Sequence, residues 1–161
     1  MSAKTYSLVT ETEVLLIERE IQRLITTFAH KLDDGKFGEV AELFQHAEYV
    51  VKGVKSVGRD DVESFFSSNV HRHADGTPRT WHLITNLVVA IDPLGDSASS
   101  VSYYTVHQRL EGFPFEPVGV GRWHDTFELC SGDWRFKSRV DEPRLTDHFL
   151  PDALNSGFEN D

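Results

Sequence analysis

The sequence has a single cysteine, an excess of acidic over basic residues, and no long hydrophobic run. Because Cys130 stands alone among 161 residues, no intrachain disulfide or cysteine-based metal cluster can form, and we expect a reduced, cytoplasmic protein. The 16 Lys and Arg against 26 Asp and Glu give a formal charge of −10, which argues against nucleic acid and against an anionic membrane surface as partners. The apolar runs, such as residues 87–91, are too short to cross a bilayer, and residues 1–13 lack the apolar core of a signal peptide.

Motifs that bind nucleotides or metals are also missing. Gly119 and Gly121 alternate without the third glycine and the following helix that a dinucleotide-binding loop requires, and no Gly-x-Ser-x-Gly segment marks a nucleophilic serine. His71 and His73 stand two residues apart, so both could hold a metal only from an extended chain and with a third ligand from elsewhere. We therefore expect neither a cofactor nor a metal.

Hydrophobic periodicity predicts helices in the first half of the chain. Residues 10–34 place apolar side chains at spacings of three and four along one face, and Gly35 follows as a stop signal. The other elements expected in this half are a short helix over 37–44, a strand at 49–51, a turn and short strand over 53–58, and a third helix that opens at residues 59–61. Three helices thus precede the rest of the chain.

From residue 80 onward the pattern changes to strands. We expect strands over residues 81–92, 98–110, 118–129 and 134–140, with turns at 93–96 and 131–133 and a loop over 111–117. Helices followed by antiparallel strands indicate the α+β class, with the helices packed on one face of the sheet. A sheet that curves strongly around the long helix would enclose an apolar pocket. The 161 residues then form one domain, with a core over about 12–141 and a tail over 142–161.

Two acids and a histidine are the first candidates for chemistry. Asp33 and Asp34 lie at the negative, C-terminal end of the predicted long helix, where carboxylates are unfavourable unless a partner elsewhere compensates them. His82 lies at the start of an apolar strand. The alternatives are a solvated helix end for the two acids and a satisfied core or edge position for the histidine.

His107 and Arg139 are the second candidates. His107 lies in the strand after the one that contains His82, and pairing through the intervening turn would bring both histidines to the same end of a hairpin, where they would face one cavity if the register allows it. Arg139 alternates in phase with Arg135 and Lys137, a pattern typical of a solvated face. Binding of a substrate anion by Arg139 is therefore the less favoured alternative.

Short segments along the chain, taken in order and spacing, carry a resemblance to a known family. They are LDDGKF at 32–37, AELF at 41–44, VGRDDV at 57–62, WHLITNL at 81–87 and GDWRF at 132–136. Together they resemble the SnoaL-like branch of the NTF2-like superfamily, which includes scytalone dehydratase, bile acid 7α-dehydratase and hexachlorocyclohexane dehydrochlorinase. The resemblance implies a cystatin-like α+β cone, in which three helices pack on a strongly curved antiparallel or mixed sheet around a pocket.

The resemblance also implies roles for individual residues. Asp33 and His82 match the aspartate and strand histidine of the dehydratases and the dehydrochlorinase, which makes them the expected catalytic pair. His107 matches a second histidine of scytalone dehydratase and is the third expected catalytic residue. The residues expected to bind substrate are Arg139, which matches an arginine of the dehydrochlorinase, together with Tyr49, Tyr104, Trp81 and Phe65. Leu32 and Lys52 depart from the family by standing near positions where catalytic tyrosines are expected.

These features predict a lyase or isomerase, similar to a dehydratase or cyclase, that works without a cofactor on a small apolar oxygenated ring compound. A carboxylate bound to one imidazole nitrogen fixes the tautomer and leaves the other nitrogen as the base. The alternative is a non-catalytic hydrophobic-ligand-binding protein or a scaffold like a dioxygenase small subunit, which a separation of Asp33 and His82 beyond about 5 Å would favour. A hydrolase or monooxygenase on the same cone is a third reading.

Apolar residues outside the predicted core indicate self-association. We expect a homodimer or homotrimer that uses the outer face of the sheet and the apolar side chains of the tail, because such residues in a polar segment are better explained by docking than by solvation. The tail residues concerned are Phe149, Leu150, Leu154 and Phe158. The expected ligand is a small apolar molecule in the cone, with neither nucleic acid nor membrane as a partner.

Overall fold

Three helices and a six-stranded sheet make up the computed structural model, which describes residues 8–145. The helices are α1 (Glu11–Asp33), α2 (Phe37–Glu42) and α3 (Gly58–Asn69). The strands are β1 (Glu48–Val51), β2 (Val54–Val57), β3 (Thr80–Ile91), β4 (Ser97–Gln108), β5 (Glu116–Cys130) and β6 (Asp133–Leu145). Their order in the sheet is β2-β1-β6-β5-β4-β3, with β1 parallel to β6 and all other neighbours antiparallel. The predicted α+β class is confirmed.

The ends of α1 follow from its capping residues. The Thr10 hydroxyl accepts a hydrogen bond from the Glu13 amide, and the Glu13 carboxylate accepts one from the Thr10 amide, so two otherwise unsatisfied N–H groups are paired. At the other end Gly35 adopts φ 70°, which lets the Lys36 amide donate back into the last turn. The predicted helix is therefore confirmed to within one residue at each end, and Asp33 is its last residue.

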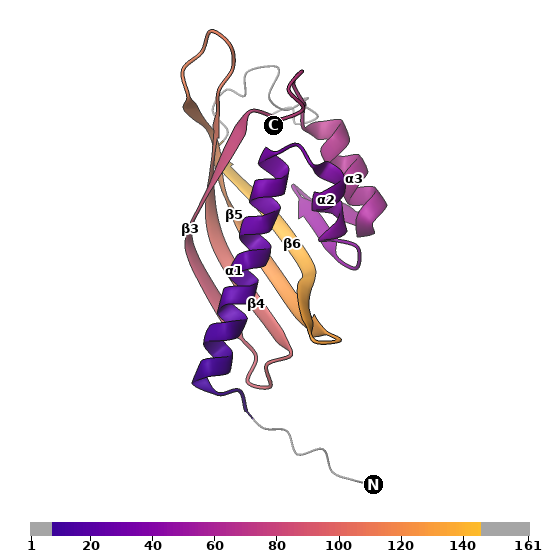
Figure 1. Cartoon of the computed structure of the whole chain (residues 1–161), viewed down its shortest axis with the longest axis vertical. Coiled ribbons are helices and arrows are strands. Elements are labelled where there is room, and N and C mark those ends of the chain that lie inside the picture. The colour runs from indigo at the N-terminus through magenta and orange to yellow at the C-terminus, as the bar shows by residue number, and fades with distance from the viewer. Residues whose placement is uncertain (1–7, 146–161) are drawn as a thin grey trace.

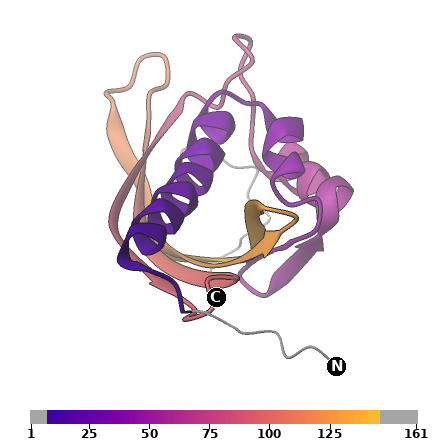
Figure 2. The same cartoon turned by 60° about the horizontal axis from the view of Figure 1, so that its bottom comes forward.

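The sheet curves around α1 and stays open. Figure 2 shows the strands as a trough that runs from β3, beneath α1, to β1 and β2 on the far side, where α2 and α3 lie. Figure 1 shows α1 lying along the concave face. The buried stripe of α1 consists of Ile21, Ile25, Phe28, Ala29 and Leu32, at the spacings expected for one helix face. No helix of the described residues is both long enough and apolar enough to cross a membrane.

Irregular strand pairing accompanies this curvature. In β3 the register shifts between Thr85 and Val88, and Asn86 takes a positive φ of 51° there. In β6 one extra residue, Lys137, interrupts the pairing with β5. A β-bulge of this kind bends its strand and raises the local twist. It also changes which residues of the strand face the concave side.

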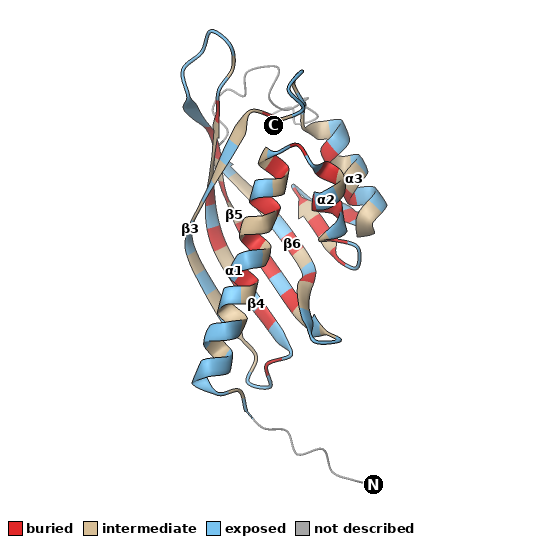
Figure 3. Cartoon of the chain, viewed as in Figure 1, coloured by how far each residue is buried: buried red, intermediate tan, exposed pale blue. Residues whose placement is uncertain are grey.

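The core fills the space between α1 and the concave face, as the buried bands in Figure 3 show. The Phe28 ring lies at its centre, edge-on to Phe44 and Phe66 at 5.9 Å and to Trp123 at 5.2 Å between ring centroids. Such aromatic pairs contribute about 0.5–1.5 kcal/mol beyond the area they bury. This packing fixes α1, and hence the position of its last residue, against the sheet.

β6 is longer than the sequence predicts. The expected strand over 134–140 continues to Leu145, and its last residues pair with β5. Pro143 does not end it, because β1 pairs with β6 only as far as Asp141 and β6 has an open edge beyond that point, where a sheet tolerates proline. The predicted docking residues Phe149, Leu150, Leu154 and Phe158 lie outside the described residues.

Candidate active site

The structure brings Asp33 and His82 together, although 49 positions separate them in the chain. Asp33 ends α1, and His82 is the third residue of β3. Asp33 Oδ1 lies 2.6 Å from His82 Nδ1, well within hydrogen-bond reach. The side chains of Asp33 and His82 remain 17% and 9% exposed. The pair is therefore largely buried but still in contact with solvent.

Two further donors hold the Asp33 carboxylate. The Thr80 hydroxyl donates to Oδ1 and the His82 backbone amide donates to Oδ2, both at 2.8 Å. Burial raises the pKa of Asp33, but hydrogen bonds and charge from His82 and a hydrogen bond from Thr80 outweigh it and hold the pKa below its usual range. These donors also compensate an acid at the negative end of a helix, while Asp34 pairs with Lys36 at 3.0 Å.

The carboxylate fixes the tautomer of His82. An ionised Asp33 only accepts hydrogen bonds, so Nδ1 of the neutral imidazole carries the proton and Nε2 keeps its lone pair. No residue among 8–145 forms a hydrogen bond with Nε2. The imidazole ring lies 6.0 Å from the Trp123 ring and 6.3 Å from the Tyr104 ring, which keeps it on the concave side. The arrangement can therefore act as a directed base.

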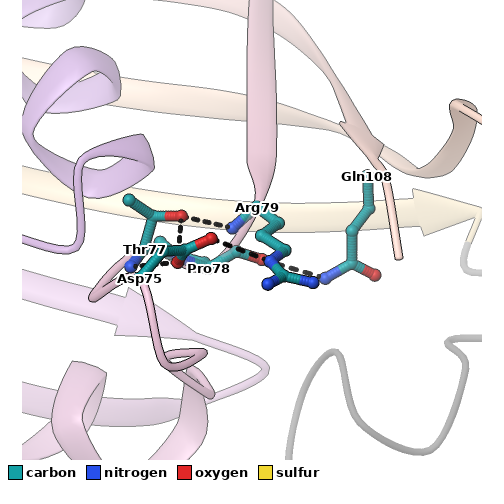
Figure 4. Close-up of polar contacts among 5 residues, drawn as sticks. All are labelled: Asp75, Thr77, Pro78, Arg79 and Gln108. Atoms are coloured by element: carbon teal, nitrogen blue, oxygen red, sulfur yellow. Dashed lines mark hydrogen bonds and ion pairs between the residues drawn. The ribbon is translucent and has the colours of Figure 1, made fainter. Parts of the chain in front are cut away.

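A turn just before β3 fixes the start of that strand, as Figure 4 shows. Asp75 accepts hydrogen bonds from the amide and hydroxyl of Thr77 and from the Arg79 guanidinium, and these bonds lower the pKa of Asp75 to about 2. The Thr77 hydroxyl accepts from the Arg79 amide. The Gln108 side chain of β4 donates to the Pro78 carbonyl at 3.1 Å. The start of β3 is thus tied to the preceding turn and to the end of β4.

His107 and Trp81 lie on the opposite, convex face of the sheet. His82 is paired with Val106, whereas Trp81 is paired with His107. Residues directly opposite share a face and successive residues alternate, so the register separates His82 from His107. The His107 ring stacks on Phe115 at 5.0 Å, and Trp81 is 63% exposed. The structure therefore does not bring the two histidines to one cavity, contrary to the expectation from the hairpin.

Arg139 points inward, contrary to the alternation of the sequence. The bulge at Lys137 shifts the phase of β6, so Arg139 is fully buried. Its Nε and Nη2 donate to the two carboxylate oxygens of Asp125, each at 2.7 Å, and its guanidinium lies 4.2 Å from the Phe28 ring and 4.0 Å from the Trp123 ring. An ion pair thus occupies the guanidinium edge that would otherwise meet a substrate anion.

The predicted residues Tyr49, Tyr104 and Phe65 lie on or beside the concave side. The ring of Tyr104 neighbours that of His82, and the ring of Tyr49 lies 5.4 Å from that of Phe65. Both tyrosine hydroxyls donate to Asp141, at 2.9 Å from Tyr49 and 2.8 Å from Tyr104. Asp141 is a site residue that the sequence did not reveal.

Potential metal ligands are dispersed. Within the described part of the chain, no three His, Cys, Asp or Glu side chains gather in an arrangement that holds a metal. The His71 and His73 rings lie edge to face at 4.8 Å. The chemistry that this geometry supports is acid–base chemistry at Asp33 and His82.

Solved structures with the same fold cover most of the chain. A protein from Novosphingobium aromaticivorans provisionally assigned as a scytalone dehydratase shares 21% identity over 94% of this chain and 100% of that one, with a TM-score of 0.69. The β subunit of a provisionally assigned aromatic-ring-hydroxylating dioxygenase from the same organism shares 20% identity over 88% and 98%, with a TM-score of 0.67. LinA shares 19% identity over 89% and 99%, with a TM-score of 0.66. An NTF2-like protein with a cystatin-like fold, also from Novosphingobium aromaticivorans, shares 21% identity over 81% of this chain and 83% of that one, with a TM-score of 0.68. At such identities the likeness establishes this fold.

The sequence also matches at the level of a family. No curated protein matches the chain. The SnoaL-like domain, however, matches residues 13–140. This range runs from the first turn of α1 to the middle of β6 and includes every element between them. The chain therefore belongs to the SnoaL-like domain family.

Proposed function

We propose that the protein is a lyase or isomerase that works without a cofactor and removes a proton from a carbon of a small, apolar, oxygenated ring compound. The contact that carries the proposal is the 2.6 Å hydrogen bond between Asp33 Oδ1 and His82 Nδ1. The SnoaL-like family includes enzymes that need no cofactor, which supports this class of reaction. Asp33 is the orienting residue in this scheme and His82 is the base.

The proposed reaction begins at Nε2 of His82. This nitrogen takes a proton from a carbon next to a carbonyl group, the C–H electron pair forms the C=C bond of an enolate, and the carbonyl π pair moves onto oxygen. The ionised Asp33 stabilises the imidazolium. Returning the proton to another carbon completes an isomerisation, whereas giving it to a hydroxyl that leaves the β carbon completes a dehydration. General base catalysis supplies about 10²- to 10⁴-fold.

A non-catalytic scaffold is the second candidate, because one of the similar structures is a dioxygenase β subunit. Such a scaffold does not require an Asp–His contact. The separation of 2.6 Å falls far inside the limit of about 5 Å beyond which a scaffold or binding protein would be favoured. The two candidates therefore differ in one measurable property, which is proton abstraction by His82.

Hydrogen–deuterium exchange in D₂O tests this property without knowledge of the natural substrate. We expect the protein to accelerate exchange of the α protons in members of a panel of aromatic and alicyclic ketones, followed by ¹H NMR. His82→Ala should lower that rate by about 10²- to 10⁴-fold while the thermal melting curve stays close to that of the wild type. His124→Ala, on the convex face of β5, is the matched control and should exchange at the wild-type rate. Equal rates for the wild type and His82→Ala would favour the scaffold.

We further propose that the convex face of the sheet joins copies of the chain into a dimer or trimer. Trp81, Leu83 and Tyr103 project from this face on β3 and β4 and are 63%, 45% and 38% exposed. Neighbouring apolar side chains of this size are typical of an interface. Sedimentation velocity should show a dimer or trimer, and Trp81→Ser should shift it towards the monomer. A monomeric wild type at high concentration would exclude this interface.

A further inference from the structure

Thr80 is the residue through which the start of β3 reaches the candidate active site. Its hydroxyl donates to Oδ1 of Asp33 at 2.8 Å, and the same oxygen lies 2.6 Å from His82 Nδ1. Thr80 and His82 are two positions apart in one strand, so their side chains share the concave face. A movement of Thr80 would therefore change the position of the oxygen that orients the imidazole.

The two residues before this threonine have all of their backbone polar groups paired. Gln108 of β4 donates from its side chain to the Pro78 carbonyl at 3.1 Å. The Arg79 amide donates to the Thr77 hydroxyl at 3.2 Å. The Arg79 carbonyl accepts from the Arg109 amide at 3.1 Å. The backbone that leads into β3 is therefore fixed in place by both side chains and main chain.

A relay of hydrogen bonds holds the Arg79 amide. The Thr77 hydroxyl accepts from this amide and donates in turn to Oδ1 of Asp75 at 3.0 Å. Nε of Arg79 donates to the second carboxylate oxygen of Asp75 at 2.9 Å, which closes the loop of contacts shown in Figure 4. We call Asp75, Thr77 and Arg79 the Asp75 turn. Because the hydroxyl accepts and donates at once, each bond of the relay polarises and strengthens the next.

Arg79 has an unusual backbone conformation within this turn. Its φ of 56° is left-handed, which is unfavourable for a residue that carries a Cβ. Such a conformation persists only where the surrounding structure over-determines it. Here the Asp75 carboxylate and the Thr77 hydroxyl hold the residue from one side and the Arg109 amide holds it from the other. The direction in which the chain enters β3 thus depends on the Asp75 turn.

We propose that Thr77 and Arg79 are positioning residues of the candidate active site, because the Asp75 turn holds the Thr80 hydroxyl on the carboxylate that orients His82. Neither residue touches a substrate in this scheme, and both act through Thr80. The assignment rests on the proposed function for its catalytic meaning, since it takes His82 to be the base. The geometry of the turn and of its bond to Asp33 does not depend on that reaction.

Loosening the turn has two consequences at the site. Oδ1 of Asp33 accepts from both Thr80 and His82, so loss of the threonine leaves the carboxylate less firmly held and Nε2 less accurately aimed at a substrate C–H bond. Misplacement of a catalytic group by about 1 Å can cost about 10²-fold in rate. Loss of the same donor also raises the pKa of Asp33, because the hydrogen bond from Thr80 helps to lower it.

Isosteric substitutions in the full chain test this series of contacts. Thr80→Val removes the hydroxyl itself and should raise the pKa of Asp33, followed by ¹³C NMR of its carboxyl carbon. It should also lower the α-proton exchange rate about tenfold, which is the worth of one good hydrogen bond. Thr77→Val removes the acceptor of the Arg79 amide and should move both quantities in the same direction by a smaller amount. Thr77→Ser keeps a hydroxyl and should return both to their wild-type values.

A double variant separates positioning from a merely structural role. Once Thr80→Val has removed the hydroxyl, adding Thr77→Val should change neither the Asp33 pKa nor the exchange rate any further. Thr126→Val is the matched control, because its hydroxyl bonds Ser138 on the convex face, and it should leave both quantities unchanged. A turn that only stabilises the fold would lower the melting temperature of Thr77→Val and leave the Asp33 pKa at its wild-type value. That result, or a fully additive double variant, would overturn the proposal.

Arg79 offers a second route that leaves Thr77 in place. Arg79→Gly and Arg79→Ala both remove the ion pair with Asp75, but glycine adopts a positive φ without the penalty that alanine meets. We therefore expect the glycine variant to stay closer to the wild type in the Asp33 pKa and in the exchange rate. A glycine variant no closer to the wild type than the alanine variant would overturn the role given to the Arg79 backbone.

The two readouts distinguish failure of this proposal from failure of the proposed function. The pKa of Asp33 is measured without a substrate, so it tests the turn independently of turnover. If exchange depends on His82 but the Asp33 pKa does not respond to Thr77→Val, the base stands and the positioning role falls. If the Asp33 pKa responds as expected while exchange ignores His82, the positioning of the carboxylate stands and the proposed reaction falls.

Discussion

The concave side of the sheet carries two acid–base pairs of almost the same geometry. Asp33 and His82 meet at 2.6 Å, and Asp125 and Arg139 meet at 2.7 Å. The first pair joins the end of α1 to an edge strand and keeps 17% and 9% of its side chains exposed, whereas the second joins two central strands and is 0% exposed at both side chains. Distance alone therefore does not separate a reactive pair from a structural one.

The two pairs differ in whether a titratable atom remains outside the ion pair. Arg139 cannot lose its proton, so its bidentate bond to Asp125 only neutralises a charge within the core. His82 gives one nitrogen to Asp33 and keeps a second that can gain or lose a proton. A pair with a spare titratable atom and residual exposure can perform chemistry, while a fully buried pair whose cation keeps its protons can only stabilise the fold.

The largest expected difference between the two pairs is in the free energy of unfolding. Asp125→Asn leaves the buried Arg139 charge without its counter-ion and should lower the free energy of unfolding by about 3–5 kcal/mol. Asp33→Asn removes a charge and keeps only one of the two oxygens that accept from Thr80 and from the His82 amide, so it should cost about 1–2 kcal/mol. Urea denaturation of both variants measures the contrast. Equal losses would mean that the Asp33–His82 pair is structural as well.

A smaller effect should appear in the pH dependence of stability, with opposite signs for Asp33 and Asp141. The pKa of Asp33 is lowered on folding, so its contribution is present above the unfolded value of about 3.9 and is lost as the pH falls through the folded pKa. The pKa of Asp141 is raised, so its contribution is present below about 3.9 and is lost as the pH rises through the folded pKa.

Urea titrations at several pH values check both signs. The stability gap between the wild type and Asp33→Asn should shrink towards acid pH, because the wild-type advantage depends on the ionised carboxylate. Relative to Asp141→Asn, the wild type should lose stability as the pH rises from about 4 towards neutrality. If both gaps moved in the same direction, one of the two assigned protonation states would be wrong.

Most of the fold could be predicted from the sequence because local signals agree with it. The apolar stripe and the Gly35 stop signal define α1 to within one residue, and β-branched and aromatic runs locate β3 to β5 to within about two residues at each end. The Asp33–His82 contact follows from the family resemblance and not from a local signal. Local sequence patterns do not predict that the end of α1 meets the start of β3, which lies far away in the chain.

The misplaced site residues all depend on strand register. The single extra residue Lys137 moves the Arg139 side chain from the convex to the concave side of the sheet. No residue type in this segment predicts such a bulge. The pairing of His82 with Val106 rather than with His107 likewise depends on the whole hairpin. Asp141 could not be predicted as a site residue because Pro143 favours the end of a strand, whereas the open edge of β6 tolerates this proline.

The protonation of His82 tests the central claim most directly. A long-range ¹H–¹⁵N correlation spectrum at a pH where the imidazole is neutral distinguishes the two tautomers of this residue. The hydrogen bond to ionised Asp33 predicts a protonated Nδ1 and a bare Nε2 in the wild type, and a mixture of tautomers in Asp33→Asn. A proton on Nε2 in the wild type would contradict the account, because the nitrogen proposed to act as the base would then have no free lone pair.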